Sequence, residues 1–509
     1  MDLFRRKPLN QLLDERGDDA HGLKKTLTAV DLMALGIGGI IGAGIFAVLG
    51  SATSGGTGMP PAGPGVTVSI LVTAVACGFC ALCYAEFASL VPIAGSAYTY
   101  SYATLGELVA WIIGWDLILE YAVGNIAVAI SWAAYFRQLM LGLGVNIPAW
   151  MASDYRSSLL AAKAVAANGI ESLSPEASIA YQAHLRHPEI FGVPIVCNLL
   201  AVMIVAGITW LLIRGVKESA RFNNVIVVLK IITLLFFIGV GVAFVKPANW
   251  HPFFPGGASG VWTGASLIFF AYIGFDAVST AAEECIDPAR DMPRGIIGSL
   301  IVCTILYVAA AVALTGMIPY AKLTGAADPL AAALHYVNQD WAAGLLAVGA
   351  VIAMTAVLLV FQLGQPRILM SMSRDGLLGP WFRKIHPKYR TPHVTTILTG
   401  VFVAFFAAIA NIDEIVQLTN IGTLFAFVLV CIGIMILRVR EPNLPRKFKV
   451  PFVPVVPILG IGMCVALMGG LPMLTWIRFV LWLAVGLVIY FLYGVRRSRL
   501  AQNAHTASK

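Results

Sequence analysis

The sequence predicts an all-α polytopic membrane protein. Of its 509 residues, 59% are hydrophobic and only 12% are charged, whereas a soluble domain carries about 25% charged residues. The apolar residues are grouped in runs of about 20, the length that an α-helix needs to cross a hydrocarbon core about 30 Å thick. This composition excludes a soluble enzyme, a nucleic-acid-binding protein and a disordered scaffold.

Twelve apolar runs are predicted as membrane helices, and the third is long enough to require tilt. The one long connection, residues 140–190, contains two predicted surface helices at 157–168 and 175–186. The predicted spans cover residues 29–51, 66–90, 108–136, 192–213, 222–245, 261–283, 295–317, 341–368, 394–410, 416–437, 451–470 and 475–494.

Basic residues are distributed unevenly between the two sides of the predicted bundle. The side that holds both termini carries 26 Lys and Arg residues, and the other side carries 7. By the positive-inside rule, both termini are predicted to be cytoplasmic in a cell (inner) membrane, with the 140–190 loop external. The net charge of +8 is explained by this orientation, so we infer neither a nucleic-acid nor a lipid partner from it.

Two of the predicted spans contain breaks. Residues 36–44 of span 1 include five glycines, each of which costs a helix roughly 0.8–1 kcal/mol relative to alanine. This predicts local unwinding, with close helix packing through small residues as the alternative. Span 6 has an interior glycine, Gly274, two residues before the acidic Asp276.

The two breaks occupy corresponding positions if the first ten spans form two repeats of five. Paired interrupted spans indicate the central site of a transporter. Half-helix N-termini attract a carboxylate, and free backbone carbonyls attract an ammonium group. An α-amino acid carries both groups on one carbon. The predicted organisation is a cytoplasmic tail (1–28), a first five-helix repeat (29–245), a second inverted repeat (246–437), helices 11 and 12 (438–494) and a cytoplasmic tail (495–509).

Ionisable residues inside spans are costly and call for an explanation. Lys230 lies deep in span 5, and Asp116 and Glu120 lie on one face of span 3. Because burial penalises the charged form of a lysine, one hypothesis is that Lys230 titrates during transport and holds broken span 1 against its neighbours. The alternative is a permanent ion pair with a buried carboxylate. Glu120 could contact the substrate amine, gate the site or tie two helices together.

The other acidic residues at span ends are predicted to be structural, and motifs for metal or phosphate binding are missing. Asp31, Glu86, Glu283 and Glu284 lie at span ends and are predicted to cap helices and anchor loops. The His and Cys spacings match no metal site, and no phosphate-binding loop is present, which excludes ATP coupling within this chain. The sequence therefore predicts no cofactor and no metal.

Several segments resemble the amino acid–polyamine–organocation superfamily. Residues 38–46 (GGIIGAGIF) and 84–100 (YAEFASLVPIAGSAYTY) are similar to its first-span and second-span signatures. Residues 115–121 (WDLILEY), 270–276 (FAYIGFD) and 367–378 narrow the resemblance to the cationic amino acid transporter group and its bacterial proton-coupled relatives. The similarity covers roughly residues 24–495.

This resemblance implies a fold of five plus five inverted helices with two extra helices, and transport by alternating access. It places the substrate carboxylate at the backbone of Gly42, Ala43 and Gly44, although relatives often have Ser or Thr near Ala43. Lys230 falls where proton-coupled members have a lysine in place of sodium. The carbonyls implied to bind the substrate ammonium belong to Ile40, Phe270, Ala271 and Ile273.

Met354 in span 8 matches the position that lines the far end of the side-chain pocket in those members, and a bulky uncharged residue there favours small or medium neutral side chains. The sequence thus predicts a protein of the lipid bilayer that imports amino acids together with protons (proton symport). Lys230 and Glu120 are the residues predicted to act in proton coupling. The alternatives are an amino acid exchanger, a transporter of cationic amino acids, a non-transporting nutrient sensor and a membrane-embedded enzyme.

Overall fold

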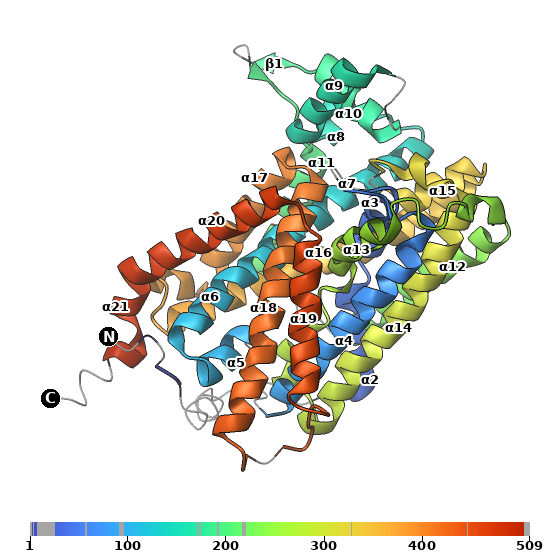
Figure 1. Ribbon diagram of the computed structural model, residues 1–509. Coiled ribbons are helices and arrows are strands. Elements are labelled where there is room, and N and C mark those ends of the chain that lie inside the picture. Colours follow the sequence, from blue (N-terminus) through green and yellow to red (C-terminus); the bar gives the residue numbers. More distant parts are fainter. Residues whose placement is uncertain are drawn as a thin grey trace.

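The structure, a computed structural model, is built almost entirely of helices. It describes residues 3, 5–7, 26–55, 59–90, 96–170, 173, 175–190, 193–215, 220–326, 328–444 and 446–502. Within these residues the only strands form one small antiparallel hairpin, β1 (Glu189–Ile190) with β2 (Val193–Pro194). The helices are arranged side by side in one bundle (Figure 1). Most of the predicted N-terminal tail and the last seven residues lie outside the described part.

Eight helical stretches in the described residues are long and apolar enough to cross a membrane, which confirms a polytopic membrane protein. Most are single helices or pairs of helices joined by a short 3-10 or π segment. They comprise η2 (Gly63–Gly65) with α4 (Val66–Leu90); α6 (Glu107–Ile118) with η3 (Leu119–Val123) and α7 (Gly124–Gly142); α12 (Ala220–Val242); α13 (Gly257–Ile268) with η6 (Phe269–Tyr272) and the start of η7 (Asp276–Glu284); α14 (Pro288–Met317); α16 (Asp340–Arg374); α18 (Ile412–Arg440); and α20 (Met473–Ile489) with η10 (Tyr490–Gly494) and α21 (Val495–Arg497).

One further span is formed by two helices with a bend between them. These are α2 (Ala29–Ile40) and the continuous pair η1 (Gly44–Val48) and α3 (Leu49–Ser54), which are inclined by 40°. Three shorter apolar helices, α11 (Leu199–Arg214), α17 (His393–Ile409) and α19 (Val455–Gly469), overlap the remaining predicted spans. Short connecting helices are α5 (Ser96–Thr104), η5 (Pro247–Trp250), η8 (Tyr320–Leu323), α15 (Pro329–Tyr336) and η9 (Pro380–Arg383).

The start of span 4 was predicted wrongly. The apolar run suggested a helix from residue 192, but α11 begins at Leu199. Pro194 belongs to the hairpin, and the Asn198 side chain caps the helix by accepting a hydrogen bond from the Ala201 N–H at 3.1 Å. The apolar residues before this cap are therefore extended chain that leads into the helix.

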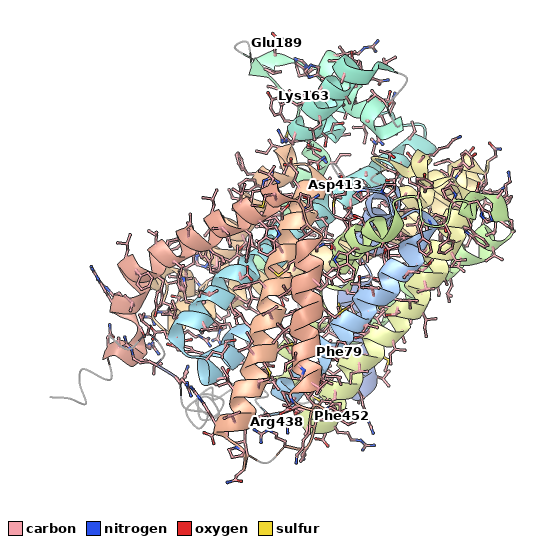
Figure 2. All side chains as sticks on the ribbon, in the orientation of Figure 1. Phe79, Lys163, Glu189, Asp413, Arg438 and Phe452 are labelled. Carbon is pink, nitrogen blue, oxygen red and sulfur yellow. The ribbon has the colours of Figure 1, made fainter. Side chains whose placement is uncertain are left out.

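A small cap covers one end of the bundle. It consists of α8 (Ala149–Ala152), α9 (Tyr155–Asn168), α10 (Pro175–Leu185) and the hairpin, and both predicted surface helices are confirmed. Figure 2 shows Lys163 and Glu189 on this cap, whereas Arg438 and Phe452 lie at the opposite end. We call these the cap end and the terminal end, because α21 (Val495–Arg497), the last helix, lies away from the cap (Figure 1).

Two acidic residues predicted as anchors have that role at the terminal end. Asp31 forms a capping box with Thr28 at the start of α2, with a hydroxyl-to-carboxylate distance of 2.7 Å. Glu86, at the end of α4, accepts hydrogen bonds from Arg438 at 2.7 and 2.8 Å and is 3.2 Å from Arg446. The Glu283 side chain lies outside the described part, so its predicted role is not tested.

Candidate functional site

Both predicted breaks are present, and each separates two half-helices. Helix α2 ends at Ile40, and the chain bends at residues 41–42 before the second half-helix begins at Gly44. In span 6, η6 ends at Tyr272, and η7 starts at Asp276 after a turn in which Gly274 has φ +111°. Positive φ is strained for residues with a side chain, so this turn requires glycine.

The two broken segments contact each other directly through their backbones. A Cβ atom on Gly274 would lie 2.8 Å from the backbone of Gly39, and a Cβ atom on Gly44 would overlap the backbone of Ala271. Side chains at these two glycines would force the segments apart. The glycines of span 1 therefore serve both predicted purposes, since they allow the helix to unwind and they let a second helix approach closely.

The Lys230 side chain bridges the break in span 1. It reaches from α12, is completely buried, and donates hydrogen bonds to the carbonyls of Gly38 at 2.6 Å and Ile41 at 3.0 Å. The last carbonyls of a helix have no partner within the helix and carry partial negative charge. Lys230 makes no ion pair with any carboxylate in the described residues, so the alternative of a permanent buried ion pair receives no support.

A tyrosine that the sequence analysis did not single out joins the two breaks. The Tyr307 hydroxyl, on α14, lies 2.9 Å from the Ile40 carbonyl and 3.1 Å from the Ala271 carbonyl. Both carbonyls belong to the set implied for the substrate ammonium. Because one phenol has a single hydrogen to donate, it satisfies one of these carbonyls at a time. A polar aromatic residue inside an apolar span was the available signal.

The other residues implied for the substrate lie around the same breaks. Ala43, Phe270 and Ile273 are buried at the edges of the unwound segments. A Cβ atom on Gly42 would lie 2.9 Å from the Val357 side chain of α16. Met354 is completely buried in the same helix, and because it precedes Val357 by three residues, it lies on the same helix face. Met354 therefore lies on the face of α16 whose Val357 is nearest to Gly42.

Glu120 belongs to a second buried cluster. It interacts electrostatically with Asp276 of η7 and with Asp116 on its own span. The hydroxyls of Tyr84 and Tyr121 belong to the same electrostatic group. All five side chains are buried, and within the described residues none of their terminal oxygens makes a hydrogen bond of normal geometry, although the carboxyl groups of Glu120 and Asp276 lie close enough to interact with each other. Lys230 is not part of this cluster, so the two residues assigned to proton coupling lie in separate environments.

Comparison with known proteins yields a consistent set of relatives. The family model described as "Amino acid permease" matches residues 27–499. The branched-chain amino acid permease BcaP of Bacillus subtilis is 46% identical over 98% of this chain and 99% of its own. A methylthioribose transporter of B. subtilis is 45% identical with the same coverage. The vacuolar cationic amino acid transporter 4 of Arabidopsis thaliana is 35% identical over 87% of this chain and 68% of its own.

Proposed function

Because the chain belongs to the amino acid permease family, we propose that it is a secondary transporter that imports amino acids by proton symport and alternating access. Membership of a permease family indicates a transporter rather than an enzyme. The preferred substrates under this proposal have small or medium neutral side chains. The observation that carries the proton-coupled part is the contact of the Lys230 ammonium with two carbonyls at the break in span 1.

The proposed architecture has twelve spans in the bacterial inner membrane. The bent pair α2 and α3 together with α11, α17 and α19 bring the eight long spans to twelve. Spans 1–5 and 6–10 form two inverted repeats, and the similar breaks in spans 1 and 6 support this assignment. The terminal end faces the cytoplasm, in agreement with the excess of basic residues on that side.

The proposed substrate site lies at the two breaks. The N–H groups of Gly42, Ala43 and Gly44 precede or begin the second half-helix of span 1, where the first N–H groups have no partner within the helix. They bind the substrate carboxylate. The ammonium group binds carbonyls of Ile40, Phe270, Ala271 and Ile273, and it replaces the Tyr307 hydroxyl at two of them.

The side chain of the substrate extends towards Met354. This part of the site is formed by apolar residues of α16 such as Val357, which contacts Gly42. An uncharged wall accepts a neutral side chain without an unpaired buried charge. A branched-chain substrate, as in the name of the BcaP relative, is compatible with such a wall.

Proton coupling in this proposal acts through the α2–α12 contact. When Lys230 is protonated, its ammonium group holds the carbonyls of Gly38 and Ile41 and stabilises the bent form of span 1. Loss of the proton turns two charge-assisted hydrogen bonds into neutral ones, which are about half as strong. Helix α2 can then move relative to α12. Glu120, which interacts with Asp276 at the start of η7, is the second proposed proton carrier.

Uptake measurements in proteoliposomes test this proposal. Radiolabelled alanine and leucine are offered with the outside acidified, to the native chain and to Lys230→Met. We expect accumulation above equilibrium by the native chain, and loss of accumulation with survival of counterflow exchange in the variant. Uptake that is indifferent to the pH gradient, with equal exchange by both proteins, would identify an exchanger or uniporter and reduce Lys230 to a structural cation.

Two other substrate classes are favoured by specific observations. The three carboxyl groups of Asp116, Glu120 and Asp276 provide a partner for a cationic side chain, and a relative named as a cationic amino acid transporter is 35% identical. Another relative, 45% identical, is named as a methylthioribose transporter. Competition of labelled leucine uptake by unlabelled arginine, lysine and methylthioribose distinguishes these classes from the neutral amino acids.

A further inference from the structure

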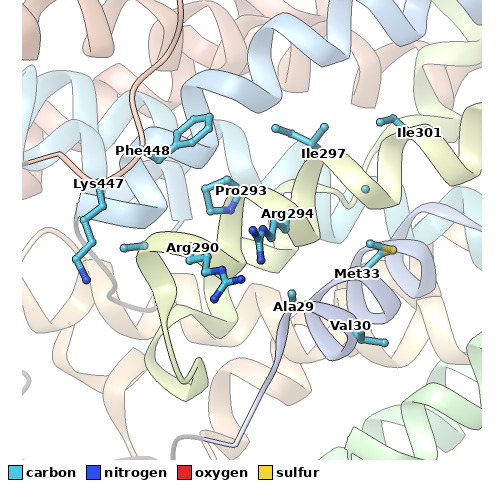
Figure 3. Close-up of a pocket in the computed structure, with 12 residues that line it drawn as sticks. Ala29, Val30, Met33, Arg290, Pro293, Arg294, Ile297, Ile301, Lys447 and Phe448 are labelled. Carbon is cyan, nitrogen blue, oxygen red and sulfur yellow. The ribbon is translucent and has the colours of Figure 1, made fainter.

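A groove at the terminal end is separate from the proposed transport site. It has a volume of about 690 Å³ and lies between the first turns of α2, the first turns of α14 and the segment that precedes α19. Figure 3 shows basic side chains at one end of this groove and apolar side chains along the rest of it. The lining residues used below are Val30, Met33, Arg290, Arg294, Ile301 and Lys447.

Three cations line the charged end of the groove. Arg290 and Arg294 are exposed on consecutive turns of α14, and neither guanidinium group has an ion-pair partner in the described part of the chain. The Lys447 side chain is 77% exposed. Its ammonium group lies 4.0 Å from a carboxylate oxygen of Asp287, a distance at which the ion pair is weak. The nearby Asp291 does not line the groove. This end of the groove is therefore complementary to an anion.

The remainder of the groove is apolar and faces outwards from the bundle. Val30 is 71% exposed and Ile301 is 55% exposed. Along α14, the positions 290, 294, 297 and 301 follow one face of the helix. The stripe begins with charges and continues with aliphatic side chains over about 16 Å, at 1.5 Å per residue. This length is close to half of a hydrocarbon core about 30 Å thick.

We propose that this groove binds one anionic phospholipid from the leaflet at the terminal end. Its phosphate lies between Arg290 and Arg294, with Lys447 beside the headgroup. One acyl chain follows Met33 and Ile301 towards the middle of the membrane. A soluble phosphate would satisfy the arginines but would leave the apolar part of the groove uncovered, so the combined pattern selects a lipid. The overall net charge gave no indication of such a site.

The position of the groove gives the lipid a role in conformational equilibrium. Val30 and Met33 belong to α2, the first half of broken span 1. The chain before α2 is tied to the end of span 6, since the N–H groups of Thr26 and Leu27 donate to the Glu284 carbonyl at 2.9 and 3.0 Å. A lipid that contacts α2 and α14 together stabilises the arrangement seen here. Binding itself does not depend on the proposed function, whereas any effect on transport rests on it.

Lipid binding to the full-length chain tests the proposal. The purified protein is placed in detergent, titrated with dioleoylphosphatidylglycerol or dioleoylphosphatidylcholine, and examined by native mass spectrometry. We expect one phosphatidylglycerol to bind preferentially and Arg290→Gln/Arg294→Gln to weaken it about thirtyfold, because each basic residue near an anionic surface contributes about a factor of five. Arg383→Gln/Lys384→Gln removes two exposed charges from another loop at the same end and should leave the affinity unchanged.

Other results would overturn the proposal. Equal binding of the two lipids, or equal loss of phosphatidylglycerol in both double variants, would reduce the interaction to general electrostatics. Displacement of the bound lipid by millimolar inorganic phosphate would identify a soluble-anion site. If the double arginine variant fails to fold, Lys447→Gln changes a surface side chain and should still weaken binding about fivefold. Loss of transport with lipid binding intact would bear only on the proposed function.

Discussion

Two buried polar regions of the bundle differ in how well their groups are satisfied. At the break in span 1, the Lys230 ammonium meets two carbonyls, and the Tyr307 hydroxyl meets two more. In the cluster of Asp116, Glu120 and Asp276, no carboxyl oxygen makes a hydrogen bond of normal geometry within the described residues, and the carboxyl groups of Glu120 and Asp276 lie beside each other. Both regions lie in completely buried surroundings, so the difference lies in their partners rather than in solvent access.

This difference indicates that the contacts at the break in span 1 stabilise the structure, whereas the acidic cluster can respond to a ligand. Breaking the hydrogen bonds of groups that are already paired costs free energy. A buried ionised group without a partner is costly, so the acidic cluster has the most to gain from a proton or a cationic ligand. We therefore expect variants at the break to affect stability and binding strongly, and neutralising variants in the acidic cluster to affect mainly coupling and selectivity.

The largest effect is expected when the break is made bulkier. Gly42→Val adds atoms where a Cβ alone would be 2.9 Å from Val357, and it blocks close approach to the backbone. Overpacking costs about 1–3 kcal/mol, and a loss of binding free energy of that size lowers substrate affinity by about 5- to 160-fold. Gly78→Val is the matched control, because a Cβ atom on Gly78 has open space around it. Normal leucine binding by Gly42→Val would remove the break from the site.

The next effect compares the two regions directly. Lys230→Met leaves the buried carbonyls of Gly38 and Ile41 without a donor, and each such group costs about 1–3 kcal/mol. We expect a clearly lower thermal unfolding midpoint for this variant in nanodiscs. Glu120→Gln keeps the size of the side chain and removes a carboxyl group that is costly to ionise beside Asp276 and Asp116, so its midpoint should be unchanged or higher. The comparison fails if Glu120→Gln is the more destabilising of the two.

The fold was largely predictable from the sequence, because apolar runs and glycine breaks are local signals. The break in span 1, the turn at Gly274 and the cap helices were all predicted from such patterns. The start of span 4 was not, since residues 193–197 are apolar whether they form a helix or an extended chain. Only the hydrogen bond by which the Asn198 side chain caps the N-terminus of α11 shows where the helix begins.

The site was predictable in part. Glycines and buried charges identified the break and Lys230, because each is costly in an ordinary span. Tyr307 was missed because it is neither a glycine nor a charged residue, and its polar hydroxyl in an apolar helix is a weaker signal than either. The interaction of Glu120 with Asp276 joins spans that are far apart in the sequence, so it depends on helix packing that local patterns do not contain. The roles of these residues in transport stay predictions.

The cap contains a buried carboxylate that has a hydrogen-bond donor, so it is intermediate between the two regions compared above. Burial raises the pKa of Asp154 to about 6, although its carboxylate accepts a hydrogen bond from the Ser157 N–H at 2.6 Å. The folded cap binds this proton more tightly than the unfolded chain, so the stabilisation is complete below about pH 4 and is lost as the pH rises through 6. A rise in pKa from 3.8 to about 6 corresponds to at most about 3 kcal/mol of stability.

Hydrogen exchange of α9 measures this pH dependence. After correction for intrinsic exchange rates, protection of α9 should be greater at pH 4.5 than at pH 7. Asp154→Asn keeps an oxygen that can cap the helix but cannot ionise, so its protection should be independent of pH over this range. If the variant keeps the pH dependence of the native chain, another group in the cap is responsible.

The smallest effect concerns which of the two buried regions receives the substrate side chain. If a neutral side chain lies against Met354, then Met354→Ser enlarges the pocket beside it. Competition should then shift towards larger or basic amino acids by about tenfold, which is the scale of small changes in such pockets. Glu120→Gln should leave leucine competition unchanged under this arrangement. If instead Glu120→Gln alone abolishes competition by arginine and Met354→Ser changes nothing, the side chain faces the acidic cluster, and the protein selects cationic substrates.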